Sequence, residues 1–373
     1  MKILFAAGGT GGHINPALAV AGEIRERHPD ADILFVGTKD RMEAKLVPAA
    51  GYDFTTIKIS GFQRSFSPGS IIANFKTLWY LLTCSGKIKK ILKSFRPDVV
   101  VGFGGYVSGP VVRMAAKLGI PTAIHEQNAY PGITNKALAK LVDKVMLTAA
   151  EAEKYMEPKN PTILTGLPVR GELLKADRDI SRAELGVRDN QKLVLSMGGS
   201  LGATTINNAM LDIIAVNCDD ENLYFLHATG QYGLWFGDKL KEKGVNHEMK
   251  KNIEIREYIS DMHRCMSAAD VVICRAGASS LSEIQAMGKA SILIPSPNVT
   301  ENHQYHNAMA LVNKNAALII EEKELTKEKM QQLFRSLTDD DERRHSIEAC
   351  AKAMSAPEAK EKIADEVISL IKC

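Results

Sequence analysis

His13 closes the stretch Gly8–His13, whose sequence is GGTGGH. The apolar run Lys2–Ala7 comes before the glycines, and apolar residues recur at helical spacing after His13, with Asn15 and Pro16 at the expected start of that helix. A strand, a glycine loop and a helix start in this order direct unpaired backbone N–H groups toward one point. We therefore expect an anionic ligand or a developing oxyanion at this loop, with His13 as its titratable side chain.

Two familiar phosphate-binding motifs do not fit this loop. Counted from Gly9 and Gly11, the dinucleotide pattern G-x-G-x-x-G would need a glycine where the chain has Ile14. The next strand runs into Thr38 rather than into a ribose-binding carboxylate, and no Gly-Lys-Ser/Thr follows the glycines as in a P-loop. A glycine turn that serves only to reverse the chain remains an alternative.

Length and composition limit the classes of protein. The chain has 373 residues, of which 45% are hydrophobic and 24% charged, and this suffices for two domains with separate cores. A net charge of +3 without aromatic-basic repeats argues against a nucleic-acid partner. Six scattered cysteines without a C-x-x-C pair favour reduced thiols in a cytosolic protein, without disulfides or zinc. We expect no signal peptide and no membrane-spanning segment.

Strand-like and helical patterns alternate throughout, which predicts an α/β fold of parallel sheets with helices on both faces. The expected strands are Lys2–Ala7, Asp32–Gly37, Thr55–Ser60, Asp98–Phe103, Thr122–His125, Lys144–Thr148, Thr162–Thr165, Lys192–Met197, Leu223–His227, Ile253–Arg256, Asp270–Cys274, Ser291–Pro295 and Ala317–Ile320. A glycine loop, Gly198–Ala203, opens the second series of strands as Gly8–His13 opens the first. We expect two doubly wound domains, 1–165 and 166–354, facing a cleft, and a final helix within about 355–373.

Two further segments follow strands of the first half. Gly102–Pro110 is a second glycine loop that should lie beside the first, where Tyr106 offers a phenol or simply packs. His125–Asn128, with the sequence HEQN, places four polar side chains after a strand. Burying such groups without partners is costly, so a site role is favoured over a solvated turn.

Two segments of the second half suit a nucleotide sugar. Arg275–Glu283 places small residues and hydroxyls at a helix start, which suits a diphosphate. Glu283 would repel phosphate and more plausibly binds ribose hydroxyls, although a glutamate is also favoured near any helix N-terminus. In Glu301–Ala308 the amides and imidazoles could bind sugar hydroxyls, and the i, i+3 pair His303 and His306 is a weak case for a metal.

The span 54–97 contains no acidic residue. It combines an apolar helical stripe with clustered lysines, which is typical of a surface that docks on anionic lipid headgroups. The alternative is a stripe that packs on the sheet while the lysines are merely solvated. The candidate docking residues are Phe62, Phe66, Ile71, Phe75, Lys76, Leu78, Trp79, Lys87, Lys89 and Lys90.

The ordered set of these motifs resembles the MurG family, the UDP-N-acetylglucosamine transferases that make the peptidoglycan lipid intermediate. The motifs are GGTGGH (8–13), GGYVSGP (104–110), HEQN (125–128), GGSLGA (198–203) and Arg275–Glu283. The resemblance covers essentially the whole chain. It implies a GT-B fold whose final helix crosses back to the first domain. It also implies inverting, metal-independent and cofactor-independent transfer of N-acetylglucosamine from UDP-GlcNAc to the 4-hydroxyl of undecaprenyl-diphospho-muramoyl-pentapeptide.

The resemblance also implies roles for residues and partners. His13 would be the base, and Tyr106 and Glu126 would face the acceptor. The donor contacts would be Thr10, Gly11, Gly12, Asn128, Arg170, Ser200, Ile259, Ala278, Ser279, Ser280, Glu283, Gln304 and Asn307. The protein would work at the cytoplasmic membrane face, on anionic inner-leaflet lipid and with a cell-wall synthesis complex. Two positions depart from the family pattern, because Leu167 and Leu201 stand where Asn and Gln are common.

Three other functions remain open from the residues alone. A UDP-GlcNAc 2-epimerase would share the two-domain fold without needing a lipid acceptor. A glycosyltransferase acting on diacylglycerol would keep the basic span and change the acceptor. A nucleotide-sugar sensor would bind the donor without turnover.

Overall fold

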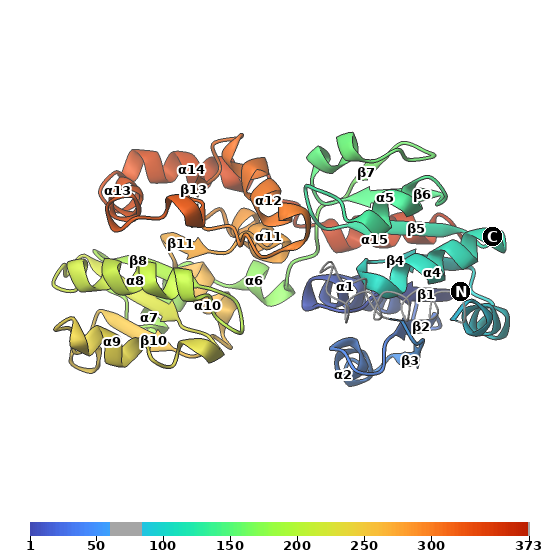
Figure 1. The fold of residues 1–373 in the computed structure, drawn as a ribbon, viewed down its shortest axis with the longest axis horizontal. Helices are drawn as coiled ribbons and strands as arrows, with labels where there is room; N and C mark the ends of the chain where they lie inside the picture. Colours follow the sequence, from blue (N-terminus) through green and yellow to red (C-terminus); the bar gives the residue numbers. More distant parts are fainter. Residues whose placement is uncertain (60–83, 372–373) are drawn as a thin grey trace, which may run out of the picture. The chain divides into compact units, whose positions relative to one another are not determined.

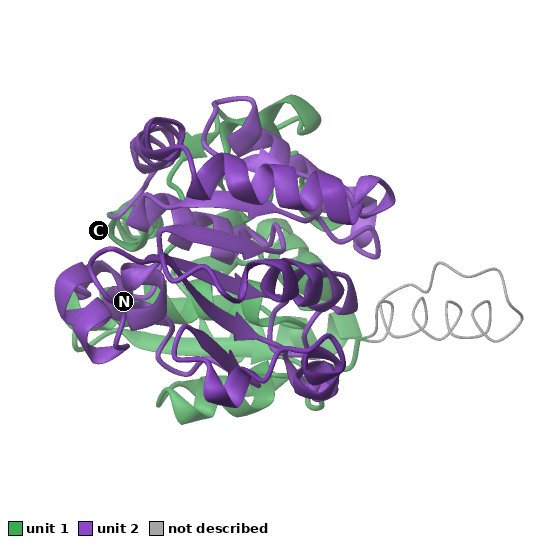
Figure 2. Ribbon diagram, turned by 90° about the vertical axis from the view of Figure 1, so that its left-hand side faces the viewer, with its two compact units in different colours: residues 1–168, 358–373 green, residues 169–357 purple. Residues whose placement is uncertain are grey.

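The structure is a computed structural model that describes residues 1–59 and 84–371. The chain forms two compact units, coloured separately in Figure 2. Unit 1 comprises Met1–Pro168 together with Glu358–Cys373, and unit 2 comprises Val169–Pro357. Each unit has its own sheet and its own core, so each is described by itself.

Among its described residues, unit 1 has a seven-stranded parallel sheet in the order β3-β2-β1-β4-β5-β6-β7 (Figure 1). Its strands are β1 (Lys2–Ala6), β2 (Asp32–Gly37), β3 (Asp53–Thr56), β4 (Val99–Gly102), β5 (Thr122–Glu126), β6 (Lys144–Leu147) and β7 (Ile163–Leu164). Because β1 pairs with both β2 and β4, the order reverses beside β1. This reversal is where a doubly wound sheet binds its ligands, at the carboxyl ends of the strands.

Helices cover both faces of this sheet. They are α1 (Gly11–Arg27), α2 (Glu43–Ala49), α4 (Gly105–Lys117), α5 (Ile133–Ala139) and α15 (Ala359–Ile368), with a 3-10 turn η1 (Ala150–Tyr155) and helical residues at 84–95. Side chains of β1 alternate between the faces. Ile3 and Phe5 join a core with α1 and α15, whereas Leu4 and Ala6 join a core with α4 and residues 84–95.

The last helix belongs to unit 1, although it follows all of unit 2 in the sequence. In Figure 1 the red α15 lies among the blue-to-green elements of unit 1, beside α1. Ile363 and Val367 are fully buried against α1. Arg27 on α1 pairs with Asp365 at 2.6 Å. Apolar burial and ion pairing together attach the end of the chain to its first helix.

Unit 2 repeats the design with a six-stranded parallel sheet among its described residues, in the order β10-β9-β8-β11-β12-β13. Its strands are β8 (Lys192–Met197), β9 (Leu223–Ala228), β10 (Ile253–Arg256), β11 (Val271–Cys274), β12 (Ala290–Leu293) and β13 (Leu318–Ile319). Its helices are α6 (Gly171–Lys175), α7 (Arg178–Glu184), α8 (Thr204–Asn217), α9 (Phe236–Glu242), α10 (Met262–Ala268), α11 (Ala278–Met287), α12 (His303–Val312), α13 (Lys327–Thr338) and α14 (Asp341–Ala353). Short 3-10 turns are η2 (Gln231–Gly233), η3 (His247–Met249), η4 (Thr300–Asn302) and η5 (Glu322–Glu324).

The parallel α/β architecture expected from the sequence is confirmed, and most strands begin and end within two residues of the expected positions. The start of the first helix was predicted wrongly. It begins at Gly11 rather than at Asn15, because the Thr10 carbonyl already accepts hydrogen bonds from the N–H groups of His13 (3.1 Å) and Ile14 (3.2 Å). Pro16 therefore lies inside the helix, where a proline donates no backbone hydrogen bond and its ring crowds the carbonyl four residues earlier. Within residues 1–59 and 84–371, none of the helices has the length and apolar character needed to cross a membrane.

Candidate functional site

The first glycine loop lies between the end of β1 and the start of α1, in the middle of the unit 1 sheet. Thr10 is the extended residue before the helix, and its side chain is exposed. Gly11 and Gly12 form the first helical positions, where backbone N–H groups have no partner within the helix. These N–H groups are available to an anion, as the sequence pattern predicts.

His13 lies in the first turn of α1 and is half-buried. Its Nδ1 is 3.1 Å from the Gly8 carbonyl oxygen and 3.3 Å from the Thr10 hydroxyl. A carbonyl oxygen only accepts hydrogen bonds, so the bond to Gly8 requires a proton on Nδ1. In this tautomer Nε2 carries the lone pair that a general base needs.

The two glycine loops of unit 1 are in contact, as expected from the sheet order. A Cβ atom on Gly104 would lie 2.8 Å from His13 Cδ2, and one on Gly105 would overlap the Gly8 carbonyl. Only glycine permits this approach, and Gly105 also has a positive φ of 78°. Tyr106, the next residue, is 57% exposed, so it is not a core-packing tyrosine. Its predicted role toward the acceptor stays a prediction.

Most of the polar side chains of the HEQN segment are buried and satisfied within unit 1. His125 Nε2 donates to the Gly166 carbonyl (2.9 Å), and Gln127 Nε2 donates to the Phe103 carbonyl (3.0 Å). Burial lowers the pKa of His125 to about 4, which the bond to Gly166 only partly opposes. His125 is therefore a neutral, structural imidazole at physiological pH.

Glu126 is 2% exposed, and its carboxylate accepts four hydrogen bonds. Oε1 accepts from the backbone N–H (3.0 Å) and side-chain amide (3.1 Å) of Asn128, and Oε2 accepts from the Gly132 N–H (3.1 Å) and the Asn135 amide (2.8 Å). Burial raises the pKa of Glu126 in spite of these bonds. The Glu126 carboxylate thus orients Asn128, which is a predicted donor contact. The predicted role of Glu126 toward the acceptor stays a prediction.

The sequence interpretation missed Glu43, a fully buried carboxylate beside the first glycine loop. Its Oε2 accepts a hydrogen bond from the Gly9 N–H at 3.1 Å, and its Oε1 accepts one from the Thr38 N–H at 3.0 Å. The sequence alone carries no signal for this contact. Glu43 comes five residues after Thr38, and it reaches Gly9 because the strand before Thr38 pairs directly with β1.

The unit 2 glycine loop, Gly198–Ala203, is held by backbone groups of the neighbouring loops. Gln231 donates its N–H to the Ser200 carbonyl (3.3 Å), and Gly230 donates to the Glu257 carbonyl (2.9 Å). The loops after β8, β9 and β10 are therefore tied together at the carboxyl edge of the sheet. Ser200 is exposed, whereas the side chain of Ile259 is 3% exposed, which leaves only its backbone for a ligand.

Glu283 on α11 and Arg170, which precedes α6, form an ion pair at 2.8 Å. The Glu283 side chain is largely buried, and burial raises its pKa although Arg170 partly offsets the effect. Ala278, Ser279 and Ser280 form the first turn of the same helix and are half-buried. These five predicted donor contacts thus belong to one region of unit 2.

Two more predicted donor contacts come from α12. Asn307 donates its amide to the Ala276 carbonyl (3.2 Å), just before α11. Gln304 uses its carbonyl oxygen to accept from the Ser296 N–H (2.9 Å). Asn307 is thereby brought to the α11 region, while Gln304 is joined to the loop after β12.

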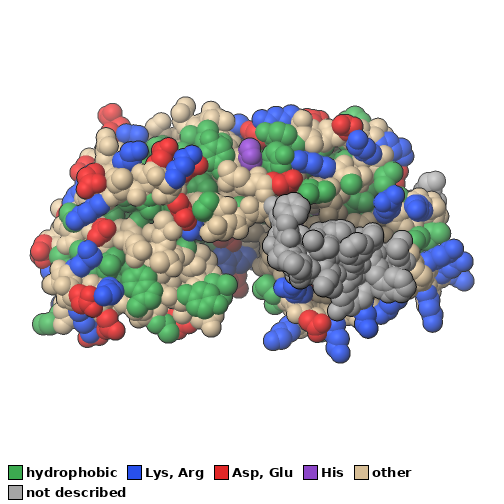
Figure 3. Space-filling view, viewed as in Figure 1, with side chains coloured by type: hydrophobic (Ala, Val, Ile, Leu, Met, Phe, Trp, Pro, Cys, Tyr) green, Lys and Arg blue, Asp and Glu red, His purple; other side chains and the backbone are tan. Residues whose placement is uncertain are grey.

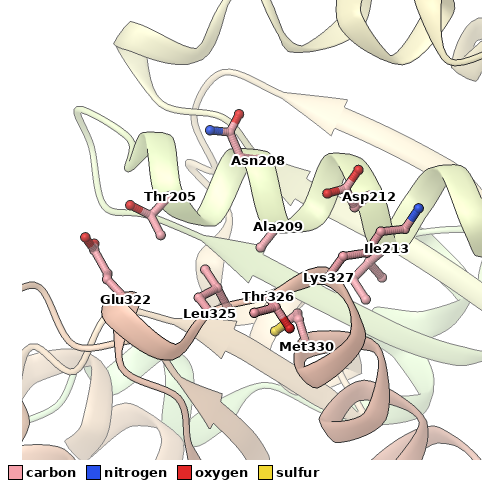
Figure 4. Close-up of a pocket in the computed structure, with 10 residues that line it drawn as sticks. All are labelled: Thr205, Asn208, Ala209, Asp212, Ile213, Glu322, Leu325, Thr326, Lys327 and Met330. Atoms are coloured by element: carbon pink, nitrogen blue, oxygen red, sulfur yellow. The ribbon is translucent and has the colours of Figure 1, made fainter.

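One cavity of unit 2, about 260 Å³ in volume, lies between α8 and the segment from η5 into α13 (Figure 4). Its lining is Thr205, Asn208, Ala209, Asp212, Ile213, Glu322, Leu325, Thr326, Lys327 and Met330. None of these is a predicted site residue, so the cavity does not mark the predicted donor site. In the part of the chain that the structure describes, no group of three or more His, Cys, Asp or Glu side chains is arranged to hold a metal ion.

Lys87, Lys89 and Lys90 are exposed on the helical residues 84–95, whose opposite side buries Ile88 and Leu92 in the core. Figure 3 shows Lys and Arg side chains in blue along the lower right of unit 1, where Figure 1 draws this teal helix. The other predicted docking residues lie outside the described residues: Phe62, Phe66, Ile71, Phe75, Lys76, Leu78 and Trp79.

Two Rossmann-like units with glycine loops at the carboxyl ends of their central strands define the GT-B fold, which glycosyltransferases share with UDP-GlcNAc 2-epimerases. The profile of the glycosyltransferase family 28 N-terminal domain matches residues 3–147, and that of the family's C-terminal domain matches residues 193–366. The crystal structure of Acinetobacter baumannii MurG is similar over 99% of both chains, with a TM-score of 0.80 and 28% sequence identity.

Two curated relatives carry the name UDP-N-acetylglucosamine–N-acetylmuramyl-(pentapeptide) pyrophosphoryl-undecaprenol N-acetylglucosamine transferase. The protein from Desulforamulus reducens is 44% identical over 96% of both chains. The protein from Acetivibrio thermocellus is 41% identical over 100% of this chain and 99% of its own. The chain therefore belongs to the MurG family of glycosyltransferases, as its ordered motifs predicted.

Proposed function

We propose that this chain transfers N-acetylglucosamine from UDP-GlcNAc to the 4-hydroxyl of undecaprenyl-diphospho-N-acetylmuramoyl-pentapeptide, with inversion at the anomeric carbon. The observation that carries the proposal is the 44% identity to a relative of that name over 96% of both chains. The three alternatives that the residues left open, an epimerase, a diacylglycerol transferase and a sensor, gain no support from the relatives.

His13 is the proposed base. A sugar hydroxyl is a poor nucleophile, so a base must take its proton as the new bond forms. The acceptor oxygen bonds to the anomeric carbon, the bond from that carbon to the UDP oxygen breaks, and the hydroxyl proton passes to Nε2 of His13. The hydrogen bond of Nδ1 to Gly8 supports this assignment, because it places the proton on Nδ1 and the lone pair of the neutral imidazole on Nε2.

Unit 2 is the proposed donor-binding unit. The departing diphosphate gains negative charge, which N–H groups at the start of α11 and the Ser200 loop would stabilise. Glu283 would bind the ribose hydroxyls. Its ion pair with Arg170 supports this role, because the pair holds the Glu283 carboxylate in a fixed position on α11. The start of this helix is the part proposed to face the phosphates. From unit 1, the proposed donor contacts are Thr10, Gly11, Gly12 and Asn128.

The proposed location is the cytoplasmic face of the membrane, with the protein attached peripherally. The exposed Lys87, Lys89 and Lys90 support docking on anionic lipid headgroups through Coulomb attraction. Binding to vesicles with anionic lipid should exceed binding to neutral vesicles and should fall with salt. Equal binding to the two kinds of vesicle would exclude this docking surface.

The test of the function is to incubate the full chain with UDP-GlcNAc, with and without the lipid-linked muramoyl-pentapeptide, and to measure UDP release. We expect UDP only when the acceptor is present, together with a disaccharide on the lipid. Epimerised UDP-sugar without acceptor would instead indicate an epimerase. Transfer of the sugar to added diacylglycerol would indicate the diacylglycerol transferase, and binding without turnover would indicate a sensor.

A further inference from the structure

Glu43 is a buried acidic residue that the proposed mechanism does not use. It is the first residue of α2 and is 0% exposed. Oε1 accepts hydrogen bonds from the Thr38 N–H (3.0 Å) and the Thr38 hydroxyl (2.7 Å), and Oε2 accepts one from the Gly9 N–H (3.1 Å). The side chain therefore joins the end of β2 to the first glycine loop.

Two glycines make the space that this side chain occupies. A Cβ atom on Gly8 would lie 2.8 Å from Glu43 Oε1, and one on Gly37 would lie 2.5 Å from Glu43 Cγ. Real Cβ atoms do not approach other atoms so closely, so any larger residue at either position would displace the carboxylate. The ends of β1 and β2 together form a slot for one glutamate.

The hydrogen-bond partners of Glu43 match an ionised carboxylate. Burial raises its pKa, but the bonds from the Thr38 side chain and from backbone N–H groups outweigh this, so the pKa is lower than usual. All three described partners are donors, and only a carboxylate offers two oxygens that both accept. An amide in its place would turn an NH₂ group toward one of these donors.

The loop that Glu43 holds also orients His13. Gly8, which adjoins Gly9, accepts the hydrogen bond from His13 Nδ1 (3.1 Å) through its carbonyl. On the other side, the absence of a side chain at Gly105 lets the α4 start pack against the same carbonyl. The Gly8 carbonyl is thus confined between two elements, and its direction decides which nitrogen of His13 carries the proton.

We propose that Glu43 is a positioning residue for His13, which fixes Gly8–Gly9 so that Nδ1 keeps its proton and Nε2 remains the acceptor. The inference rests on the proposed function only in giving His13 the role of base. It adds that a carboxylate on α2, remote in sequence from the motif, sets the tautomer of that base. It also means that the Gly9 N–H is occupied by the protein's own carboxylate, which leaves Gly11 and Gly12 for an external anion.

The variant Glu43→Gln tests the proposal. It keeps the size of the side chain but removes one acceptor and the charge, so the loop should shift and the tautomer should become mixed. We expect kcat to fall about tenfold or more, since displacements of the order of 1 Å cost that much. The donor KM should stay within about twofold, because the proposed donor contacts of unit 2 are untouched.

The tautomer is read directly by two-bond ¹H–¹⁵N spectra of protein labelled with ¹⁵N-histidine, at about pH 8, where an ordinary imidazole is neutral. The His13 signals are assigned by their absence in His13→Gln. In the unaltered chain Nδ1 should be the protonated nitrogen. In Glu43→Gln the signals should move toward the Nε2–H form.

Glu23→Gln is the matched control. Glu23 is also nearly buried in unit 1, on α1, but it pairs with Arg27 (2.6 Å) and Lys360 (2.7 Å) away from the loop. This variant should lower the melting temperature without changing the tautomer or kcat. If Glu43→Gln does not fold, Thr38→Val removes only the hydroxyl donor, and a smaller change of the same kind is expected.

A folded Glu43→Gln or Thr38→Val with an unchanged His13 tautomer and unchanged kcat would overturn the proposal. Failure of the proposed function gives a different result: His13→Gln would keep its kcat, while the tautomer would still respond to Glu43→Gln. The two ideas can therefore fail separately.

Discussion

The sheet of each unit has a strand, a glycine loop and a helix in succession, β1 to α1 in unit 1 and β8 to α8 in unit 2, but different groups complete the two loops. The loop of unit 1 is held by side chains, because Glu43 bonds to Gly9 and His13 bonds to Gly8. The loop of unit 2 is bonded to neighbouring backbone instead, since the N–H groups of Gln231 and Tyr232 donate to the carbonyls of Ser200 (3.3 Å) and Leu201 (3.0 Å). The contacting Glu43 and Gln231 both come from segments that follow the neighbouring strand, β2 in unit 1 and β9 in unit 2.

One local geometry thus suits two different proposed tasks. Two titratable groups adjoin the loop of unit 1, which suits proton transfer. The loop of unit 2 is tied to neighbouring backbone, and unit 2 has the small residues and hydroxyls of the α11 start, which suits binding of a charged donor. The glycines allow other groups to approach the loop closely in both units. The segment that follows the neighbouring strand supplies the approaching group.

The largest expected effect belongs to the histidine that only unit 1 has at its loop. His13→Gln should lower kcat by about 100-fold or more with little change in the donor KM, because it removes a group needed only as the bond forms. Steady-state kinetics with both substrates measures this. His28→Gln, at the opposite end of α1, is the control and should keep its kcat. An unchanged kcat in His13→Gln would remove the functional difference between the loops.

Replacing the glycine that packs against each loop by alanine should change a different kinetic constant in each unit. Gly105→Ala would push on the Gly8 carbonyl and should lower kcat, whereas Gly230→Ala would push on Gly202 and should raise the donor KM, each by about tenfold. Steady-state kinetics on the two variants measures these effects.

The controls for these two variants are Gly119→Ala and Gly244→Ala. Both positions also have a positive φ, but a Cβ there meets nothing within 4 Å. Each should cost only about 1 kcal/mol of unfolding free energy, with unchanged kinetics. If Gly105→Ala and Gly230→Ala showed the same kinetic change, the proposed division of labour would be wrong.

The last prediction concerns stability rather than activity, through the buried histidine of each sheet. Burial lowers the pKa of His125 in β5 to about 4 and that of His227 in β9 to about 3. In the unfolded chain both titrate near pH 6.5, so below that pH unfolding takes up protons and the free energy of unfolding falls. Each histidine should contribute a slope of about 1.4 kcal/mol per pH unit, which ends near pH 4 for His125 and continues toward pH 3 for His227.

Urea unfolding between pH 7 and pH 4 measures these slopes, with His125→Asn and His227→Asn compared with the unaltered chain. Each variant should show a shallower dependence on pH. A slope equal to that of the unaltered chain would mean that the histidine is not buried in its neutral form.

The sequence predicted the sheets well because strands that are buried on both faces read as apolar runs ended by glycine or polar residues. It also predicted the contact between Gly8–His13 and Gly102–Pro110, since parallel strands end at one edge. It did not find Glu43, because the hydrogen bond of this residue to Gly9 depends on the pairing of β1 with β2. It also favoured a site role for all four side chains of the HEQN segment, whereas His125 is fully buried in the sheet.

The most direct test of the division between the loops is calorimetric titration of UDP into His13→Gln and Glu283→Ala. We expect His13→Gln to bind UDP as the unaltered chain does although its kcat is about 100-fold lower, and Glu283→Ala to bind UDP about tenfold more weakly. Glu348→Ala, which removes another partly buried carboxylate of unit 2, is the control. Weak UDP binding by His13→Gln together with unimpaired binding by Glu283→Ala would contradict the account.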